Sequence, residues 1–486
     1  MRDILEYLAD RAIKQPDAIA FRDDDGAISY GRLARRVQGM SEILQDGLGT
    51  VGILAPNGID WVVCDLACKH ASRTMVPIPA FFSPEQVAHI INDAEIEMIV
   101  CTADMAPALS PSSVRIARID GAPEKPFSLP QSINWRQIIY TSGTTGRPKG
   151  VVLDRAQINT SIEALADTIA LTADGCYLSI LPFALLLEQI CGIYIPLKAG
   201  IESRLSARVA RACFQGDFKT LINGINEAQP SYLVLVPELL RGWVAALERT
   251  GTTAPPSLRF VAVGGAHVGQ ALAEQAWQLG IPVHEGYGLS ECCSVVAVNR
   301  PGARRPNTVG QVLPGLRVEI EQGEIVVYGA TVMEGYLGGA PVDHCWRTGD
   351  MGELDWDGYL RVYGRRDDLI VTTLGRNLSP AWIEGMILND PNFLFAAVIG
   401  DDLAFPVAIV VPSQAGEAWM RAATADDLGK FVNELCVEAP VYARPVETHV
   451  TDMATLVSNR LLNPQGKPDR HRLQAYFINQ LTAQCA

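Results

Sequence analysis

Residues 137–153 read QIIYTSGTTGRPKGVVL, and this stretch decides how the rest of the chain is interpreted. Its apolar ends predict two short strands, Gln137–Ile139 and Val151–Leu153. Glycines between them let backbone amides approach phosphate oxygens, while the hydroxyls and the Lys149 ammonium add hydrogen-bond donors and charge. The segment differs from the Gly-x4-Gly-Lys-Ser/Thr loop, because a strand and not a helix follows the lysine. We therefore predict a phosphate-binding hairpin with contacts from Thr141, Ser142, Gly143, Thr144, Thr145, Gly146 and Lys149.

Strands alternate with helices on both sides of this hairpin. Ser83, Pro84 and Gln86 have the residue types of a helix start, with a serine cap, proline at the first position and a side chain that reaches back. Such alternation predicts parallel sheets covered by helices. The expected strands and helix are 51–54, 59–69 (the helix), 74–78, 231–236 and 260–263.

The pattern changes after Gly323 to short strands separated by glycine and aspartate turns. A charged, turn-prone segment, 364–368, interrupts this run, and a compact α+β unit follows it. The predicted fold class is therefore α/β. We expect a large N-terminal domain, residues 1–364, of stacked sheets with helices, parallel βαβ units and a small β-barrel-like part. A small mobile α+β domain, residues 365–486, would follow.

Composition narrows the function. A chain of 486 residues with 48% hydrophobic residues can bury more than one core. The formal charge of -14 disfavours nucleic acid as the main partner. Eleven cysteines without a Cys-x-x-Cys pair indicate buried thiols in a reducing cytosol. Glu188 and Gln189 interrupt the most apolar stretch, Tyr177–Leu197, so we predict no transmembrane segment and a cytoplasmic protein. Whether it is a monomer or a homodimer stays open.

Four further segments follow the hairpin in order. They are GYGLSE at 286–291, WRTGD at 346–350, GR at 364–365 with GRNLSP at 375–380, and PQGK at 464–467. With the hairpin they resemble the five ordered signatures of the adenylate-forming superfamily, which comprises acyl- and aryl-CoA synthetases, peptide-synthetase adenylation domains and beetle luciferases. The resemblance covers almost the whole chain. It implies an AMP-forming acid–thiol ligase that uses ATP, Mg2+ and coenzyme A.

The resemblance also implies individual roles. Tyr287 would stack on adenine, Asp350 would accept hydrogen bonds from the ribose hydroxyls, and Arg365 would help to hold the nucleoside. Glu291 would be the magnesium ligand, and the implied catalytic residues are Lys467, Glu291 and Thr145. The remaining implied cofactor contacts are Gly264, Gly265, Ala266, Glu285, Gly286, Gly288, Ser290, Val362, Gly375 and Arg376.

Lys467 lies in the small domain, far along the chain from the hairpin. This placement makes sense if the small domain swings, closing for adenylation and then rotating to present another face for thiol attack. In the family the pivot follows the Gly-Arg pair, which makes Asp367 the expected hinge. Gly375 would line the thiol channel in the second state.

Residues 178–189 read LSILPFALLLEQ and resemble the acyl-site signature of fatty acyl-CoA synthetases, with Leu185 at the position of the usual histidine or aromatic gate. The segment holds no aspartate to pair with an α-ammonium group, which disfavours an amino acid substrate. Its leucines, with the small residues at 264–266, favour an apolar acyl tail. The expected substrate contacts are Phe183, Leu185, Gly265 and Gly288.

The favoured substrate is a medium- or long-chain fatty acid, transferred to coenzyme A. An aryl-acid–CoA ligase is the first alternative. A fatty acyl-AMP ligase that loads the phosphopantetheine of an acyl carrier protein is the second, although the short run from Glu291 to Trp346 favours coenzyme A. A catalytically silent sensor of nucleotide or acyl ligands belongs to another class, and the presence of both Glu291 and Lys467 argues against it.

Overall fold

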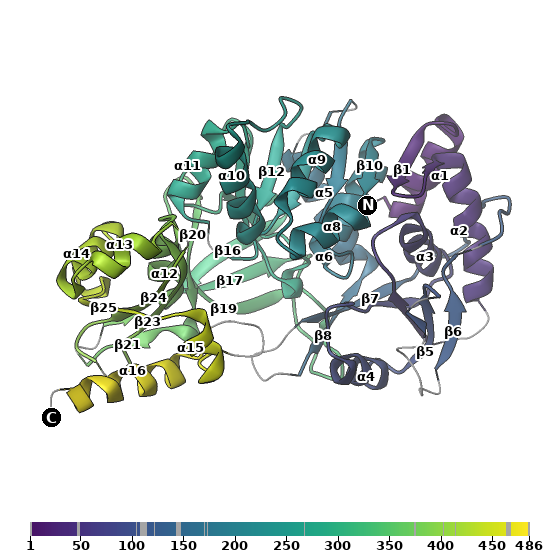
Figure 1. The fold of residues 1–486 in the computed structure, drawn as a ribbon. Coiled ribbons are helices and arrows are strands. Elements are labelled where there is room, and N and C mark those ends of the chain that lie inside the picture. The colour runs from purple at the N-terminus through teal and green to yellow at the C-terminus, as the bar shows by residue number, and fades with distance from the viewer. Residues whose placement is uncertain are drawn as a thin grey trace.

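The computed structural model describes most of the chain, and the elements after strand β20 gather at one end of the molecule (Figure 1). The larger N-terminal part contains two extended sheets with helices between and around them. The described residues are 2–45, 49–103, 105–106, 114–120, 122–141, 147–169, 171–172, 174–266, 268–373, 376–401, 403–413, 415–462 and 468–484.

The larger sheet has nine strands in the order β15-β14-β13-β12-β11-β9-β10-β1-β2. Strands β1, β10, β9, β11, β12 and β13 pair in parallel, and antiparallel strands extend both edges. The six parallel strands therefore bring their carboxyl ends to one edge of the sheet, where α/β proteins commonly bind ligands. The bounds are β1 Ile19–Asp23, β2 Ala27–Ser29, β9 Cys176–Ser179, β10 Glu202–Leu205, β11 Tyr232–Leu235, β12 Phe260–Val263, β13 Val283–Tyr287, β14 Ala297–Val298 and β15 Gln311–Val312.

The second sheet has seven strands in the order β18-β8-β7-β4-β3-β5-β6. Its centre is parallel, whereas β7 and β8 form an antiparallel pair that ends at Thr141 opposite Lys149. The predicted strand–loop–strand hairpin is therefore present. The bounds are β3 Thr50–Leu54, β4 Thr74–Pro77, β5 Ile96–Cys101, β6 Arg115–Arg118, β7 Arg136–Thr141, β8 Lys149–Asp154 and β18 Gly335–Tyr336.

Helices bury both faces of the seven-stranded sheet. On β3, Ile53 belongs to the main core between the two large sheets, whereas Leu54 packs with Ile90 of α4 on the opposite face. This alternation is what a strand buried on both sides requires. The helices are α1 Ile4–Lys14, α2 Tyr30–Leu44, α3 Ile59–His70, α4 Pro84–Asp93, α5 Arg155–Ile169, α6 Leu186–Gln189, the π-helix η2 Ile190–Tyr194, α7 Ile195–Ala199, α8 Ala207–Phe214, α9 Phe218–Ala228, α10 Pro237–Thr250 and α11 Gln270–Gln278.

The start of α4 confirms the predicted capping residues. The Ser83 hydroxyl accepts a hydrogen bond from the Gln86 amide at 3.3 Å, and the Gln86 side chain accepts one from the Ser83 amide at 3.0 Å. Pro84 occupies the first helical turn. Two backbone donors that the helix itself cannot pair are thereby satisfied.

A four-stranded antiparallel sheet, β16-β17-β19-β20, stands where a barrel-like part was expected. The described strands form an open sheet, since four strands are too few to close around a filled interior. Its bounds are β16 Leu316–Glu321, β17 Glu324–Gly329, β19 Cys345–Leu354 and β20 Leu360–Arg365. The short 3-10 helix η3 Ser290–Cys292 follows β13, and a second one, η4 Arg366–Asp368, follows β20.

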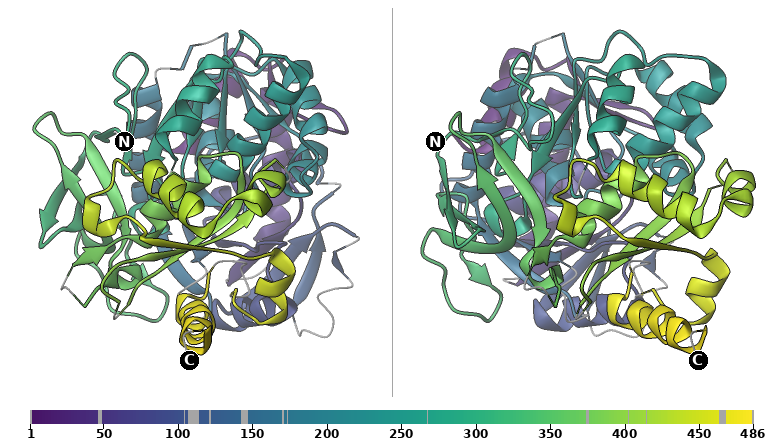
Figure 2. Two further views of the ribbon diagram at one scale, coloured as in Figure 1. Left: turned by 60° about the vertical axis from the view of Figure 1, so that its left-hand side comes forward. Right: turned by 90° about the vertical axis from the view of Figure 1, so that its left-hand side faces the viewer.

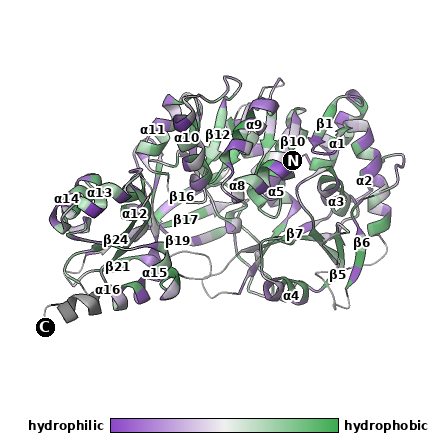
Figure 3. Ribbon diagram, viewed as in Figure 1, coloured by the Kyte–Doolittle hydropathy of each residue, from purple (hydrophilic) through white to green (hydrophobic). Residues whose placement is uncertain are grey.

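The C-terminal part contains a three-stranded sheet, β23-β24-β25, with helices on both faces (Figure 2). Val398 packs with the helices that include α12 and α14, whereas its neighbour Ile399 packs with α15 and α16. Hydrophobic residues lie along the strands, while outer helices such as α2 carry mixed faces (Figure 3). The bounds are β21 Ile370–Val371, β22 Asn377–Leu378, α12 Pro380–Leu388, β23 Phe393–Ile399, β24 Val407–Pro412, α13 Glu417–Ala422, α14 Ala425–Leu435, η5 Val441–Ala443, β25 Glu447–Val450, α15 Met453–Ser458 and α16 Arg470–Gln484.

Within the described ranges, none of the helices combines the length and the apolar character that crossing a membrane requires. The apolar stretch 177–197 is divided among β9, α6, η2 and α7.

Gly310 holds β14 and β15 together and provides a test of the fold. Its φ is +84°, and a Cβ there would lie 2.0 Å from the Val298 carbonyl carbon. Gly302 has a similar φ of +75° with open space around it. Gly310→Ala should therefore lower Tm by at least about 5 °C more than Gly302→Ala, because both variants share the left-handed backbone cost but only one clashes. Equal shifts in thermal unfolding would contradict this packing.

Candidate active site

The phosphate-binding hairpin is described on both sides of its tip. Tyr140, on β7, donates a hydrogen bond to Asp93 of α4 at 2.6 Å, which holds the strand against that helix. Gly150 lies over the Tyr140 ring, and a Cβ there would approach the ring to 3.1 Å. Thr141 and Lys149 pair directly at the last described step. The other predicted phosphate contacts lie outside the described residues, and their roles stay predictions: Ser142, Gly143, Thr144, Thr145 and Gly146.

Tyr336 connects two of the predicted site residues. Its hydroxyl donates a hydrogen bond to Glu291 Oε1 at 2.7 Å, and the Lys149 ammonium lies 5.5 Å from the centre of its ring. The ring also meets Trp346 edge-on at 5.8 Å. Burial, and then the Glu291 hydrogen bond, raise the pKa of the Tyr336 hydroxyl, so that it remains a donor at neutral pH. Carboxylate oxygen is the ligand type that Mg2+ prefers, so the side chain of Glu291 fits its predicted role as a magnesium ligand.

The predicted nucleoside contacts lie together between two sheets. The Tyr287 hydroxyl of β13 donates to Asp350 Oδ2 of β19 at 2.6 Å. Arg365 stands opposite Asp350 in the β19–β20 pair, with a guanidinium nitrogen 3.5 Å from Asp350 Oδ1 and 2.7 Å from the Thr348 carbonyl oxygen. Burial raises the pKa of the Asp350 carboxyl, and the Tyr287 hydrogen bond opposes this shift. Residues from three separate motifs therefore converge.

Glycines let the backbones of β12 and β13 approach closely at the carboxyl ends of these strands. A Cβ at Gly264 would lie 3.0 Å from the Gly286 carbonyl oxygen, and one at Gly288 would lie 1.6 Å from that of Ser294. Gly265 has a φ of +85°, which favours glycine. The cradle can therefore receive a ligand close to the main chain. Two neighbours that were also predicted as contacts, Ala266 and Ser290, follow β12 and begin η3 respectively.

The Glu285 side chain is engaged with two neighbouring protein side chains. Its buried carboxylate accepts hydrogen bonds from Arg304, at 2.5 and 3.1 Å, and from the Asn299 side-chain amide at 3.0 Å. Both oxygens are thus engaged with protein groups. The structure places the Glu285 side chain in an ion pair that holds β13 to the following loop, and a nucleotide contact at Glu285 stays a prediction.

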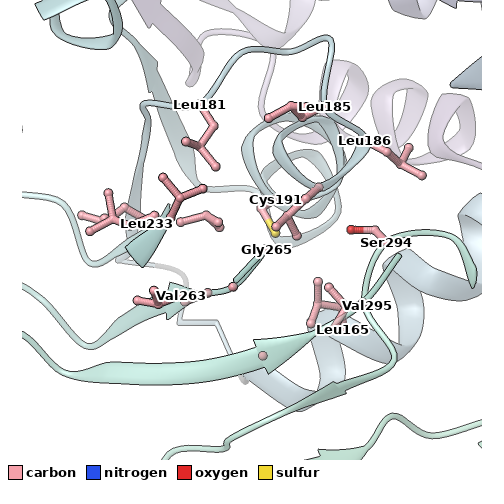
Figure 4. A pocket seen from close by; sticks show the side chains of 18 of the residues that line it. Leu165, Leu181, Leu185, Leu186, Cys191, Leu233, Val263, Gly265, Ser294 and Val295 are labelled. Atoms are coloured by element: carbon pink, nitrogen blue, oxygen red, sulfur yellow. The ribbon is translucent and has the colours of Figure 1, made fainter. Parts of the chain in front are cut away.

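A cavity of about 370 Å³ opens beside the glycine cradle and is lined mostly by apolar side chains (Figure 4). Leu181 comes from the loop after β9, Cys191 from η2 and Val263 from the end of β12 (Figure 4). The cavity is also lined by both Tyr232 and Val236, so it follows β11 for roughly 13 Å, at the usual rise per residue of a strand. It therefore combines an opening at the predicted nucleotide site with an apolar interior.

Three aromatic residues form a row across this cavity. Tyr232 stands opposite Tyr177 in the β11–β9 pair and opposite Phe260 in the β11–β12 pair, and all three line the cavity. Phe260 is stacked on His284, with ring centres 4.4 Å apart. Residues opposite one another in a sheet lie on the same face, so the three rings make one aromatic wall.

The predicted substrate contacts divide into two groups. Leu185 lines the cavity and is 36% exposed, and Gly265 and Gly288 line it as well. Phe183 is 1% exposed and packs against Trp61, with ring centres 5.0 Å apart. Its side chain therefore belongs to the core, because the loop turns it away from the cavity towards α3.

The predicted C-terminal residues are described in part. Asp367 lies in the exposed turn η4, and its carboxylate is 3.9 Å from Arg365. The Arg376 guanidinium stands 5.5 Å from the centre of the Tyr442 ring. Val362 packs beside the apolar core of the four-stranded sheet. Gly375 and Lys467 lie outside the described residues, so the hinge, the swing and the domain boundary stay predictions.

Glu188 is a buried carboxyl beside the cavity. The Tyr177 hydroxyl donates to Glu188 Oε2 at 3.1 Å. Burial raises the pKa of Glu188 to about 8, although Ser179, Tyr177 and the Ile180 amide oppose the shift. The carboxyl is therefore mainly neutral at pH 7.

Sequence reasoning missed Tyr336 and the aromatic wall. Tyr336 belongs to no predicted motif, although it precedes Trp346 by a short interval of glycine-rich sequence. The strands 231–236 and 260–263 were predicted, but their register was not, and it is the register that places Tyr232 opposite Phe260. Tyr177 could be added only after the strand order was known.

Comparison with known proteins identifies the family. A model described as AMP-binding enzyme matches residues 8–337, and a model described as AMP-binding enzyme C-terminal domain matches residues 367–481. A 2-succinylbenzoate–CoA ligase of Bacillus cereus is 28% identical over 445 residues, which cover 85% of this chain and 89% of that protein.

Solved structures share the fold. An anthranilate CoA ligase in complex with anthranoyl-AMP has a TM-score of 0.83 and 18% identity, and the alignment covers 99% of this chain and 98% of that one. The o-succinylbenzoate CoA synthetase of Bacillus subtilis, in complex with its acyl-adenylate, has a TM-score of 0.78 and 24% identity, with 96% and 97% covered. The same B. subtilis enzyme with ATP and magnesium ion has a TM-score of 0.78 and 23% identity, with 96% and 99% covered.

The chain belongs to the AMP-binding enzyme family, the adenylate-forming superfamily that its five motifs resemble. The predicted fold class and the predicted enzyme class, an AMP-forming acyl-CoA synthetase, are confirmed at the level of this family. The predicted use of ATP, Mg2+ and coenzyme A is confirmed at the same level.

Asp350 provides a test of the nucleoside site. Asp350→Ala removes a buried acceptor that would pair with the ribose, and should raise KM for ATP by roughly 10- to 100-fold, the range for one charged hydrogen bond. Asp355→Ala is the matched control, because Asp355 ends the same strand region but pairs with Arg305. Pyrophosphate release at varied ATP measures both variants. Equal KM values for ATP in the two variants would show that Asp350 does not contribute to the nucleoside site.

Glu188 provides a test of pH dependence. Its pKa in the folded protein, about 8, lies above the ordinary value of 4.5, so its contribution to stability is complete below pH 4.5 and disappears as the pH rises through 8. Glu188→Gln cannot titrate. The Tm of the wild type should therefore fall relative to that of Glu188→Gln between pH 5 and pH 9, by an amount equivalent to a few kcal/mol at most. Parallel Tm curves would show that burial does not shift this carboxyl.

Proposed function

We propose that the chain is an aromatic-acid–CoA ligase, which adenylates an aromatic carboxylic acid and transfers the acyl group to coenzyme A. The observation that carries this proposal is the wall formed by Tyr177, Tyr232 and Phe260 inside an apolar cavity beside the glycine cradle. Aromatic rings pack favourably by stacking or edge contacts. The proteins named in the comparisons act on 2-succinylbenzoate and anthranilate, which supports the same class.

The residues suit a reaction in two steps, adenylation of the acid and transfer of its acyl group to a thiol. A carboxylate oxygen of the acid attacks the α-phosphorus of ATP, the mixed anhydride forms and pyrophosphate leaves. The sulfur of coenzyme A then attacks the acyl carbon, its proton is lost and AMP leaves. In the first step Lys149 and the hairpin would hold the outgoing phosphates, while Tyr287 and Asp350 would hold the nucleoside. Magnesium at Glu291 and the Lys467 ammonium would neutralise charge at the α-phosphorus.

The length of the cavity favours an acid larger than benzoate. It follows β11 from Val236 to Tyr232, roughly 13 Å at the usual strand rise, and a single ring would leave part of this space unfilled. Side chains that line an unfilled part of the cavity would lack van der Waals contacts with the ligand. We therefore propose an aromatic acid that carries a substituent or a second ring.

A fatty acid is the second candidate, and it was the favoured substrate from sequence. The same length and the leucines that line the cavity, Leu181, Leu185 and Leu186, would suit a medium-length alkyl chain. No relative reported above is named for a fatty acid, whereas aromatic acids recur among them. The aromatic acid is therefore the main proposal.

A panel of acids decides between the two. Pyrophosphate release is measured with benzoate, 2-aminobenzoate, 2-succinylbenzoate, octanoate and dodecanoate, first with hydroxylamine as acceptor and then with coenzyme A. We expect the highest kcat/KM for 2-succinylbenzoate or another substituted aromatic acid. Saturation by octanoate or dodecanoate with weaker use of every aromatic acid would overturn the proposal in favour of the fatty acid.

Ala262 provides a matched variant for the length of the cavity. It stands opposite Val234 on the cavity face of the sheet, between the glycine cradle and the aromatic wall. Ala262→Leu should lower kcat/KM for the larger acids by roughly 10- to 100-fold, the range for overpacking, and affect benzoate much less. An equal loss of kcat/KM for all acids would show that the tails of the larger acids do not extend past Ala262. Ala246→Leu, on the far helix α10, is the control for general overpacking.

A further inference from the structure

Gln189 is a polar side chain in the most apolar stretch of the chain, and both the oxygen and the nitrogen of its amide have hydrogen-bond partners. Its nitrogen donates to the Phe183 carbonyl oxygen. Its oxygen accepts from the Gln137 side chain of β7 and from the Tyr194 hydroxyl, the latter at 3.1 Å. The side chains of Gln189 and Gln137 are both completely buried. The orientation of the amide is therefore set by three contacts from three different segments.

A buried ion pair lies behind this amide. Lys69 and Asp65 of α3 are in direct contact and almost completely inaccessible to solvent. The Lys69 ammonium donates to the Tyr194 hydroxyl oxygen at 2.9 Å. The single hydrogen of that hydroxyl has two acceptors within reach, Gln189 Oε1 and Asp65 Oδ1, each at 3.1 Å, and it bonds one of them at a time. The ammonium also stands 4.8 Å from the centres of the Tyr194 and Trp135 rings. The pair thus holds the hydroxyl that contacts Gln189.

Such a network is a poor source of stability. The cost of removing two charges from water can exceed their attraction, and apolar replacements of buried pairs are often neutral or stabilising. A buried polar network does, however, restrict the arrangement of the groups that it connects. In this one, Asp65 Oδ2 and Gln137 Oε1 are buried without a hydrogen-bond partner among the described residues, whereas the Gln189 amide oxygen and nitrogen both have partners. Tyr194 also ends η2, a π-helix, and such interruptions of α-helices are frequent at functional sites.

The network connects the two halves of the candidate active site. Phe183 belongs to the loop that presents Leu181 and Leu185 to the cavity, and a second amide, Asn57, accepts from the Phe183 amide at 2.9 Å and donates to the Leu181 carbonyl oxygen at 2.7 Å. At the other end, β7 runs from Gln137 to Thr141, where the phosphate-binding hairpin begins. Gln189 joins the loop to this strand directly.

We propose that Gln189 is a positioning residue: its amide ties the loop that lines the acid-binding cavity to strand β7, and the buried Asp65–Lys69 pair holds that amide in place through Tyr194. This inference rests on the proposed function, because it assigns the cavity to the acid. Gln189 does not touch the reacting atoms. It sets the distance between the wall that receives the acid and the strand that leads to the phosphates.

The test replaces Gln189 by methionine, which keeps the length of the side chain and removes its hydrogen bonds. With 2-succinylbenzoate and octanoate as probes, KM for the accepted acid should rise about tenfold, the effect of one lost buried hydrogen bond, while kcat changes less than about threefold. Gln137→Met should raise KM less. The double variant should be no worse than Gln189→Met, because the two side chains share one contact.

Asn159→Leu is the matched control. Asn159 is another buried amide, but it donates to Asp3 at 2.9 Å, away from the cavity. The variant Asn159→Leu should lower Tm without raising KM for the acid. If Gln189→Met lowers Tm in the same way and keeps the wild-type KM, Gln189 is structural only and the proposal is wrong. If Gln189→Met does not fold, Gln137→Met is compared with the wild type instead. A KM for the acid equal to that of the wild type in Gln137→Met would then also show that the proposal is wrong.

Hydrogen exchange separates this proposal from the proposed function. In the wild type without substrates, amides of residues 181–187 should exchange more slowly than in Gln189→Met, by roughly tenfold, and Asn159→Leu should match the wild type. Faster exchange in Gln189→Met, together with a wild type that uses neither probe acid, would reject the proposed substrates and leave the positioning role standing. Unchanged exchange and unchanged KM would overturn the positioning role.

Discussion

The parallel direction of β9, β11, β12 and β13 is the constraint on which the candidate active site depends. Because these strands run the same way, the glycines after β12 and within β13 come to one edge, and the aromatic residues at the strand starts come to the other end of the same face. One cavity can therefore connect a nucleotide cradle with an aromatic wall. An antiparallel neighbour at this place would have reversed one of the two sets.

The parts of the site that could be predicted from sequence are those in which a short motif determines its own geometry. The hairpin is one example, since two apolar strands joined by a loop between Thr141 and Lys149 leave little choice of pairing. The shared role of Tyr287, Asp350 and Arg365 was predicted in a different way, from the family resemblance, because these residues belong to three separate motifs. The capping residues of α4 were equally local, because Ser83 and Gln86 bond to each other within one helical turn.

Other features depend on contacts between distant segments, which no local pattern contains. The carboxylate of Glu285 is bound by Arg304 and Asn299 from the next loop, and these partners could not be read from its own motif. Phe183 was expected in the substrate site, but the direction in which its loop turns places the ring on Trp61. The barrel-like part is an open four-stranded sheet, because the number of strands that join a sheet follows from packing and not from the sequence of each strand.

The aromatic wall and the polar network around Gln189 both suit a rigid ligand better than a flexible one. A fatty acid has many rotatable bonds and loses conformational freedom when it binds, whereas an aromatic acid is already rigid. A rigid ligand gains most from walls that are equally well placed, since small displacements remove stacking contacts without a chance for the ligand to adapt. The buried amide that holds the Phe183 carbonyl oxygen, and the row of rings from Tyr177 to Phe260, are therefore more useful to an enzyme for aromatic acids than to one for flexible chains.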